Sequence, residues 1–287
     1  MSEDSEIDKV TQRSLDAYTR IADARVKEIV QGLIRHLHAC VKDIKPSDEE
    51  WEYAWTFMAN MAKFTGEERN EYLLFADVIG VSQLIETVNH FRPPSTAGYA
   101  LVGPFYRANA PARKWGESIA SNDTPGDRVR VTGKVYDIDG GAPIRATLNV
   151  WQAATNGLYE NQDDKQPDYN LRGQFETDDS GAFELVALMP TPYPAPTDGP
   201  VGDLLRAAQR SPYRPAHIHF IVSSPNYETF VTQVFVRGDE KIPSDVVFTA
   251  GEDKIGDFRR EKGEYRLNYD FQLKRGVSRM PKAPIPS

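Results

Sequence analysis

The stretch RVRVTGKV, residues 128–135, has valine at positions 129, 131 and 135, alternating with polar or small residues. Alternation with a period of two is typical of a half-buried β-strand. Further short apolar segments follow at residues 146–151, 183–188, 217–222, 230–236 and 265–273, separated by clusters of Gly, Pro and Asp. Strands punctuated in this way favour an antiparallel β-sandwich over a parallel α/β sheet. We predict that this sandwich occupies residues 106–287.

The residues before this stretch have the helical period instead. Apolar side chains recur three and four residues apart, at Leu15, Tyr18, Ala22, Val26, Ile29, Leu33 and Leu37. The run Ser47–Glu50 is a capping box that opens a second helix, and a third helix is expected from about Glu67 to Asn89. The predicted fold class is therefore α+β, with an N-terminal helical domain over residues 1–105 that leads into the sandwich.

The composition limits the classes of function. The net charge of −8 gives no reason to expect nucleic acid or an anionic membrane as a partner. A single cysteine, Cys40, excludes a disulfide framework and a thiolate-rich metal site. The N-terminus lacks the pattern of a signal peptide, and no apolar run approaches the roughly 20 residues that cross a bilayer. We therefore expect a cytoplasmic protein without membrane insertion.

Histidine pairs are the first candidates for metal binding. His36 and His38 lie on a predicted helix, where residues two apart point in different directions. His217 and His219 lie on a predicted strand, where residues two apart share a face and can converge on one ion. Because imidazole binds iron, copper, nickel and zinc, the strand pair is the candidate metal site. Two ordinary hydrogen-bonded histidines are the alternative interpretation.

Two long, irregular stretches, residues 152–180 and 189–215, are candidates for the rest of this site. Loops of such length in a compact domain are usually functional. Phenolate is a hard, anionic donor that suits iron(III), so the tyrosines near the histidines deserve comparison. The residues alone do not choose among them: Tyr159, Tyr169, Tyr193, Tyr213 and Tyr227.

Two other classes of function remain open at this point. In the first, a carboxylate such as Glu160 or Asp179 joins the strand histidines in a zinc or iron(II) hydrolase or oxygenase. In the second, the chain is a non-catalytic β-sandwich binding module whose histidines are structural. The first class predicts a colourless metalloprotein, and the second predicts no stoichiometric metal.

Four motifs fall in a distinctive order: GLYEN at 157–161, PTPYP at 190–194, RPAHIHF at 214–220 and Thr232–Gln233. In these motifs the chain resembles the intradiol ring-cleavage dioxygenases of the catechol and hydroxyquinol 1,2-dioxygenase type. The resemblance extends from the N-terminal helices to about residue 275. It implies one Fe(III) per subunit, bound in the sandwich domain by Tyr159, Tyr193, His217 and His219. It also implies an aromatic diol and O2 as substrates.

The resemblance further implies how the site works. Tyr193 is the ligand expected to leave the metal and accept a proton from the diol. Arg214 and Gln233 are expected to face the charge that develops on the ring. The substrate pocket is expected to comprise Leu74, Asp77, Leu101, Val102, Gly103, Pro104, Phe105, Ala195, Pro196, Arg214 and Val247.

Asp77 carries the expectation about the substrate. A carboxylate at this wall resembles the hydroxyquinol branch, where it accepts a hydrogen bond from a third ring hydroxyl. The expected reaction is cleavage of hydroxyquinol (benzene-1,2,4-triol) to 3-hydroxy-cis,cis-muconate or its tautomer maleylacetate. Cleavage of catechol to cis,cis-muconate is the alternative. The hydroxyquinol branch usually has an aromatic residue at the position of Val102, so this residue departs from that branch.

The resemblance also has implications for assembly. Members of the family pair as homodimers through their N-terminal helices and hold a phospholipid at the interface. Both are therefore expected here, with Leu33, Ile34, Leu37 and Val41 as the stripe that meets the second copy.

Overall fold

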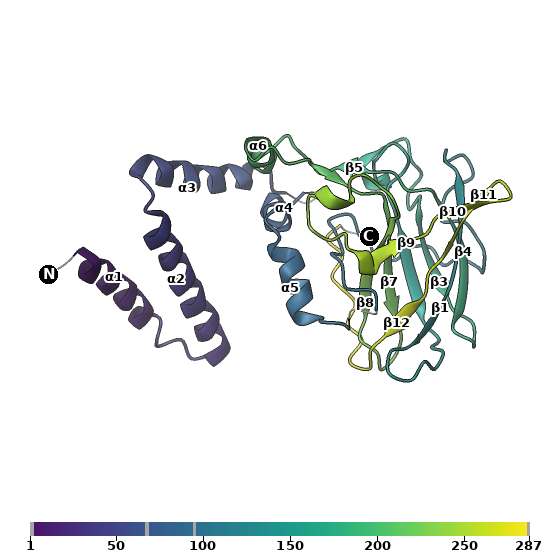
Figure 1. The fold of residues 1–287 in the computed structure, drawn as a ribbon, viewed down its shortest axis with the longest axis horizontal. Coiled ribbons are helices and arrows are strands. Elements are labelled where there is room, and N and C mark those ends of the chain that lie inside the picture. The colour runs from purple at the N-terminus through teal and green to yellow at the C-terminus, as the bar shows by residue number, and fades with distance from the viewer. Residues whose placement is uncertain (1–2, 67–68, 94–95, 286–287) are drawn as a thin grey trace. The chain divides into compact units, whose positions relative to one another are not determined.

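The computed structural model describes residues 3–66, 69–93 and 96–285, and it divides the chain into two compact units, Met1–Ala59 and Asn60–Ser287 (Figure 1). The first unit contains α1 (Glu3–Ala17), α2 (Ala24–Ile44) and most of α3 (Asp48–Lys63). The second contains the remaining helices and the described strands. The α+β class is confirmed, whereas the domain boundary near residue 105 stays a prediction.

The first unit is held by caps and by polar contacts between α1 and α2. The side chain of Asp23 accepts hydrogen bonds from the N–H groups of Arg25 and Val26 at the start of α2. The Lys42 ammonium of α2 lies 2.7 Å from the Asp8 carboxylate of α1. The predicted capping box is confirmed, because the Glu50 carboxylate accepts a hydrogen bond from the Ser47 N–H at 2.8 Å and the Ser47 hydroxyl accepts one from the Glu50 N–H at 3.2 Å.

The apolar stripe of α2 faces solvent in the single chain. Its side chains are between 47% and 66% exposed, at Val26, Ile29, Leu33, Leu37, Val41 and Ile44. A stripe of this length in an amphipathic helix is ordinarily covered. Among the described residues, no helix is long and apolar enough to span a membrane.

The single helix expected from about residue 67 to Asn89 is two helices, α4 (Glu71–Val78) and α5 (Val81–Asn89), and Glu67 itself lies outside the described residues. Asn70 caps α4 by accepting a hydrogen bond from the Leu73 N–H at 3.0 Å. The chain then turns at Gly80, whose φ of 79° lies in the left-handed region that glycine adopts at little cost. The expectation was wrong because apolar residues continue through the turn and hide the break.

The second unit is built around two five-stranded sheets, with the strand orders β10-β11-β1-β12 (β4 also pairs with β1) and β3-β2-β7-β8-β9. Figure 1 shows the strands of the two sheets packed as layers. The strands are β1 (Arg128–Asp137), β2 (Thr147–Trp151), β3 (Arg172–Glu176), β4 (Ala182–Leu188), β7 (His217–Ser223), β8 (Phe230–Val236), β9 (Ile255–Gly256), β10 (Arg259–Glu261), β11 (Glu264–Asn268) and β12 (Phe271–Leu273).

Most strand pairs are antiparallel, but β1 pairs in parallel with β11 and β12, and β8 with β9. The alternation predicted for β1 is confirmed, since Val129, Val131 and Val135 are fully buried in the core. Strands β7 and β8 are buried over nearly their whole length. Both faces of this sheet are therefore covered, one of them by the site described below.

The two stretches expected to be irregular contain short elements that position the site. The first holds a 3-10 turn, η1 (Glu160–Gln162), and strand β3. The second holds a two-stranded ribbon of β5 (Tyr193–Pro194) and β6 (Tyr213–Arg214), with α6 (Pro200–Ala207) between them. Strands of two residues have no detectable period, so only the pairing in three dimensions defines them.

Gly133 allows β1 to change partner within one strand. β1 pairs with β11 through Thr132 and with β12 from Val135 onward, and the Tyr269 N–H bonds to the Thr132 carbonyl at 2.9 Å between them. A Cβ at Gly133 would collide with the Tyr269 carbonyl oxygen and the Phe183 ring.

Gly133→Ala is therefore expected to lower the free energy of unfolding by about 2–3 kcal/mol, the cost of overpacking a core. Urea unfolding measures the change. Gly140→Ala is the matched control, because a Cβ there meets nothing within 4 Å among the described residues and the backbone φ is not positive. Equal stability losses in both variants would contradict the conclusion that β1 needs a glycine at position 133.

Candidate active site

Strand β7 places His217 and His219 on one face of its sheet. In the pairing register, His219 lies opposite Trp151 of β2 and Gln233 of β8. Cross-strand partners share a face, so the three side chains form a row across the sheet. The Trp151 ring stacks on the His219 ring with centroids 4.6 Å apart and an interplanar angle of 11°. The imidazole orientation is thereby set by packing.

The two long stretches bring Tyr159 and Tyr193 to this face. Tyr159 comes directly before η1, and the Phe105 ring stacks on it with centroids 4.6 Å apart. Tyr193 pairs with Arg214 across the β5–β6 ribbon. The turn before Tyr159 contains Gly157 at φ 82°, where a Cβ would lie 3.2 Å from the Tyr193 Cβ. The glycine therefore lets the two tyrosines approach each other.

Four donor atoms meet in this buried space. The Tyr159 hydroxyl lies 3.0 Å from the Tyr193 hydroxyl and 3.1 Å from His219 Nε2. His217 Nε2 lies 3.1 Å from His219 Nε2. All four residues are buried, and none of them is more than 8% exposed.

The protonation states of the histidines suit lone-pair donation. His217 Nδ1 lies 2.6 Å from the Pro215 carbonyl, so it carries the proton and leaves Nε2 as an acceptor. Burial, followed by the Arg214 charge, lowers the pKa of His217 to about 3. Burial and the neighbouring His217 lower the pKa of His219 as well. Both rings are therefore neutral at pH 7.

The tyrosines have the opposite requirement. Burial raises the pKa of Tyr159 well above its ordinary value, and the adjacent Tyr193 raises it further. Burial also raises the pKa of Tyr193, although the Arg214 guanidinium opposes this shift. Without a cation between them, both phenols stay neutral, and a cation would favour the phenolates.

This donor set fits one transition-metal ion. Nitrogen and oxygen donors at about 2.0–2.2 Å from a shared metal lie roughly 3 Å apart, as these four do. His219 Nδ1 is buried and has no hydrogen-bond partner among the described residues, so Nε2 is its only atom that faces other donors. Two hard oxygen donors and two imidazoles suit iron(III). A zinc site with thiolate ligands or a calcium site with oxygen ligands would need different donors.

The rival tyrosines are placed elsewhere. The Tyr169 hydroxyl donates to the Ala108 carbonyl, and the Tyr227 hydroxyl donates to the Asp137 carboxylate. Tyr213 is 37% exposed, with the Lys241 ammonium over its ring. The structure therefore brings together the two tyrosines that the resemblance implied and leaves the others outside.

The carboxylates of the alternative metal centre are also elsewhere. Glu160 accepts hydrogen bonds from Arg172 and Arg107, and Asp179 forms an exposed ion pair with Arg145. In the described part of the chain, no group of three His, Cys, Asp or Glu side chains is placed to hold a metal ion. The geometry therefore does not assemble a two-histidine, one-carboxylate site.

Arg214 is a fixed cation beside the donor cluster. Its guanidinium bonds to the Asp245 carboxylate at 2.8 Å and to the Gln233 side-chain oxygen at 2.6 Å. The Gln233 amide in turn donates to the Leu101 carbonyl at 2.8 Å. Burial opposes the charge on Asp245, but the Arg214 guanidinium and the Ala250 N–H hold the pKa of its carboxyl below the ordinary value. No sequence pattern pointed to Asp245, because it lies 31 residues downstream of its partner.

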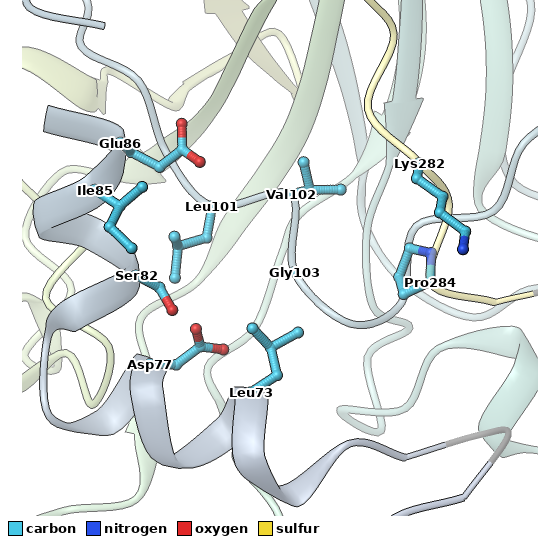
Figure 2. Close-up of a pocket in the computed structure, with 10 residues that line it drawn as sticks. All are labelled: Leu73, Asp77, Ser82, Ile85, Glu86, Leu101, Val102, Gly103, Lys282 and Pro284. Carbon is cyan, nitrogen blue, oxygen red and sulfur yellow. The ribbon is translucent and has the colours of Figure 1, made fainter. Parts of the chain in front are cut away.

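Two adjoining cavities open beside the cluster. A cavity of about 190 Å³ has Leu74, Asp77, Pro104, Phe105 and Pro196 in its wall. A second cavity of about 280 Å³ has Asp77, Leu101, Val102 and Gly103 in its wall (Figure 2). Leu73 and Asp77 line both. Gly103 brings the larger cavity to the donor cluster, since a Cβ at Gly103 would lie 3.5 Å from His219 Cε1.

Three of the predicted pocket residues, Ala195, Arg214 and Val247, are buried but line neither of these cavities. The prediction missed several lining residues from α5 and the C-terminal segment, namely Ser82, Ile85, Glu86, Lys282 and Pro284. Figure 2 shows the α5 residues on one side of the cavity and the C-terminal pair on the other. Their distance in sequence explains the omission, because only the fold brings them together.

Asp77 is a buried carboxyl in both cavity walls. Burial raises its pKa to about 6, and the Ser82 hydroxyl and the Arg214 charge limit the shift. Figure 2 shows its carboxyl group directed toward Ser82. A carboxylate held in an apolar wall gains from a hydroxyl partner, so this position suits a ligand that carries one.

Comparison with known proteins gives consistent matches. Residues 101–275 match the family model described as Dioxygenase, and residues 23–96 match the one described as Catechol dioxygenase N terminus. The chain is 42% identical over 245 residues to a hydroxyquinol 1,2-dioxygenase of Rhizobium sp. (strain MTP-10005), covering 85% of this chain and 83% of that protein. It is 35% identical to a catechol 1,2-dioxygenase of Candida albicans (strain SC5314), covering 88% and 87%.

Among solved structures, the chain resembles a hydroxyquinol 1,2-dioxygenase from Pseudomonas putida DLL-E4 with a TM-score of 0.89 and 32% identity. The match covers 95% of this chain and 100% of that one. The likeness therefore includes the helices as well as the sandwich.

Proposed function

Since the chain belongs to the intradiol ring-cleavage dioxygenase family, we propose that it uses iron(III) and O2 to open hydroxyquinol to 3-hydroxy-cis,cis-muconate. Both oxygen atoms of O2 end in the two new carboxyl groups. The observation that carries the proposal is the buried cluster of two phenols and two imidazoles beside the Asp77 cavity. Catechol, cleaved to cis,cis-muconate, is the second candidate substrate.

In this proposal, Tyr159, Tyr193, His217 and His219 hold one iron(III) per chain. The bound metal supplies Lewis acidity that binds and ionises the diol. The mutual distances of about 3 Å among the donors support the assignment. The neutral imidazoles and the phenols, which ionise only beside a cation, support it as well.

The remaining residues manage protons and charge. Tyr193 would accept one of the protons of the diol at its phenolate oxygen. Arg214 is held by Asp245 and Gln233, so its charge is available to the ring oxygens without any rearrangement. The Gln233 amide accepts a hydrogen bond from the Arg214 guanidinium and donates one to the Leu101 carbonyl. It thereby fixes the position of the guanidinium relative to Leu101.

A visible absorption spectrum tests the proposal directly. Tyrosinate-to-iron(III) charge transfer is expected to colour the protein, and the band is expected to shift when hydroxyquinol is added under nitrogen. A colourless protein with stoichiometric zinc or iron(II) would contradict the tyrosine ligands. A protein without stoichiometric metal would instead support the binding-module hypothesis.

Asp77 is proposed to select hydroxyquinol by accepting a hydrogen bond from its third hydroxyl. Asp77→Asn is expected to lower kcat/KM for hydroxyquinol by about 10–100-fold and leave catechol within about threefold, because hydrogen bonds to charged groups contribute roughly 1.5–3 kcal/mol. In the wild type, the ratio of the two kcat/KM values is expected to fall as the pH drops through about 6. Equal losses on both diols would contradict this role.

The same variant has a predicted effect on stability. The folded-state pKa of Asp77 lies above its unfolded value of 3.8, so folding favours its protonated form. The stability from that form is complete below the unfolded pKa and is lost as the pH rises through about 6. Asp77→Asn is therefore expected to raise the free energy of unfolding at pH 8 by about 1–3 kcal/mol and to have little effect at pH 3.5.

We also propose that the chain forms a homodimer through the exposed stripe of α2, and that a phospholipid lies at that interface. The six exposed apolar side chains of the stripe support the first part. Sedimentation that shows a monomer at micromolar concentration would contradict the dimer, and lipid extraction tests the second part. The cytoplasmic location stays a prediction.

A further inference from the structure

The cavity of about 280 Å³ is larger than the one of about 190 Å³ beside it, and it reaches from Gly103 to Ile85 and Pro284. The smaller cavity is bounded by Phe105, which stacks on Tyr159, and so lies next to the metal-binding face. The larger one continues from the shared residues Leu73 and Asp77 toward Ile85 and Pro284 (Figure 2). A diol ring placed in the smaller cavity would leave free the part of the larger one that lies near Ile85 and Pro284.

The lining of the larger cavity indicates what would fill it. Leu73, Ile85, Leu101, Val102 and Pro284 give it mostly apolar walls. Such walls gain free energy when they bury hydrocarbon. We propose that this cavity is a substituent chamber: the enzyme accepts aromatic diols whose ring carries an uncharged alkyl group on the carbon next to the hydroxyl that faces Asp77.

The charged residues of the chamber favour an uncharged substituent over an acidic one. Asp77 and Glu86 contribute two carboxyl groups and Lys282 contributes one ammonium group. Lys282 is exposed to water, whereas Asp77 is 7% exposed. A carboxylate in the chamber would thus be repelled by the buried Asp77 carboxylate. Its attraction to the Lys282 ammonium would be weak, because water and salt screen that exposed charge.

This inference rests on the proposed function, and a binding series separates the two. Under nitrogen, the shift of the visible band measures dissociation constants for hydroxyquinol and for 5-methyl-, 5-ethyl- and 5-propylbenzene-1,2,4-triol. Each added methylene is expected to tighten binding by roughly two- to fourfold. Failure of hydroxyquinol itself to bind would overturn the proposed function, whereas binding that weakens steadily with chain length would overturn only the chamber.

Ile85→Phe narrows the chamber from α5, at a residue that is 52% exposed and outside the smaller cavity. It is expected to weaken binding of the propyl compound by at least tenfold and to leave hydroxyquinol within about twofold. Leu84→Phe is the matched control, because Leu84 is the preceding residue of the same helix, is 62% exposed and lines neither cavity. Equal losses for both ligands in the Ile85 variant, or equal effects of the two variants, would overturn the assignment.

A carboxylate-ended chain of the same length tests the charge argument. It is expected to bind at least tenfold more weakly than the propyl compound. Tighter binding that disappears in Lys282→Ala would overturn the uncharged class and assign the chamber to acidic substituents instead.

Discussion

The substitutions Tyr159→Phe and Tyr193→Phe are each expected to lower kcat for ring cleavage by well over 100-fold. Each change removes one hydroxyl and retains the ring that packs in the buried cluster. Residues that merely orient metal ligands contribute about 10–100-fold, so the loss of a ligand should exceed that range. Both variants should stay folded, because the aromatic contacts of Tyr159 with Phe105 and of Tyr193 with His217 do not involve the hydroxyl.

The two variants should differ in a way that a structural role would not explain. Each retains one phenolate, so a charge-transfer band is expected to persist with altered energy and lower intensity. Tyr193→Phe also removes the proposed proton acceptor. Its loss of activity relative to the wild type is therefore expected to be smaller at high pH, where the substrate is already ionised. Iron content, the visible spectrum and kcat are the measurements.

Tyr213→Phe is the matched control for these variants. Tyr213 lies next to Arg214 in sequence but outside the donor cluster, partly exposed beneath the Lys241 ammonium. Its substitution is expected to leave iron content and spectrum unchanged and kcat within about twofold. A wild-type spectrum for Tyr159→Phe or Tyr193→Phe, or a lost band for Tyr213→Phe, would contradict the ligand assignment.

Arg214→Gln is expected to have the second large effect, on both activity and stability. Loss of a preorganised group that stabilises developing charge lowers kcat by about 100–1000-fold. The substitution also leaves Asp245 buried without its cation, which destabilises a protein by roughly 3–5 kcal/mol. Because the pKa of Asp245 lies below its ordinary value, the stability from this pair is complete above the unfolded pKa of about 4 and is lost as the pH falls through the folded one.

A double variant separates the two effects. Arg214→Gln combined with Asp245→Asn removes both charges, so most of the lost stability should return in urea unfolding at pH 7. Activity should not return, because the cation that faces the ring is still absent. If the double variant regains wild-type kcat, Arg214 is only a structural partner of Asp245, and its role toward the ring is wrong.

Several features of the fold could be predicted from local sequence. The valine alternation at 129–135 predicted a half-buried strand, and the capping box at Ser47–Glu50 predicted a helix start; both are confirmed. Each signal depends on residues within a few positions of one another, which is why it can be detected without tertiary information. The helix expected to run to Asn89 was wrong for the same reason, since one glycine at 80 interrupts it within an otherwise apolar stretch.

The sequence by itself determined the α+β class and the spacing of His217 and His219 on one face of a strand. By resemblance, it also indicated which tyrosines accompany them. Only the tertiary structure decided that these four donors meet within about 3 Å, that Asp245 holds Arg214, and that α5 and the C-terminal segment enclose a second cavity. The physical reason is that these contacts join residues far apart in the chain. Their proximity depends on which sheets and loops pack their apolar faces together. The local periodicity of the sequence does not indicate that packing.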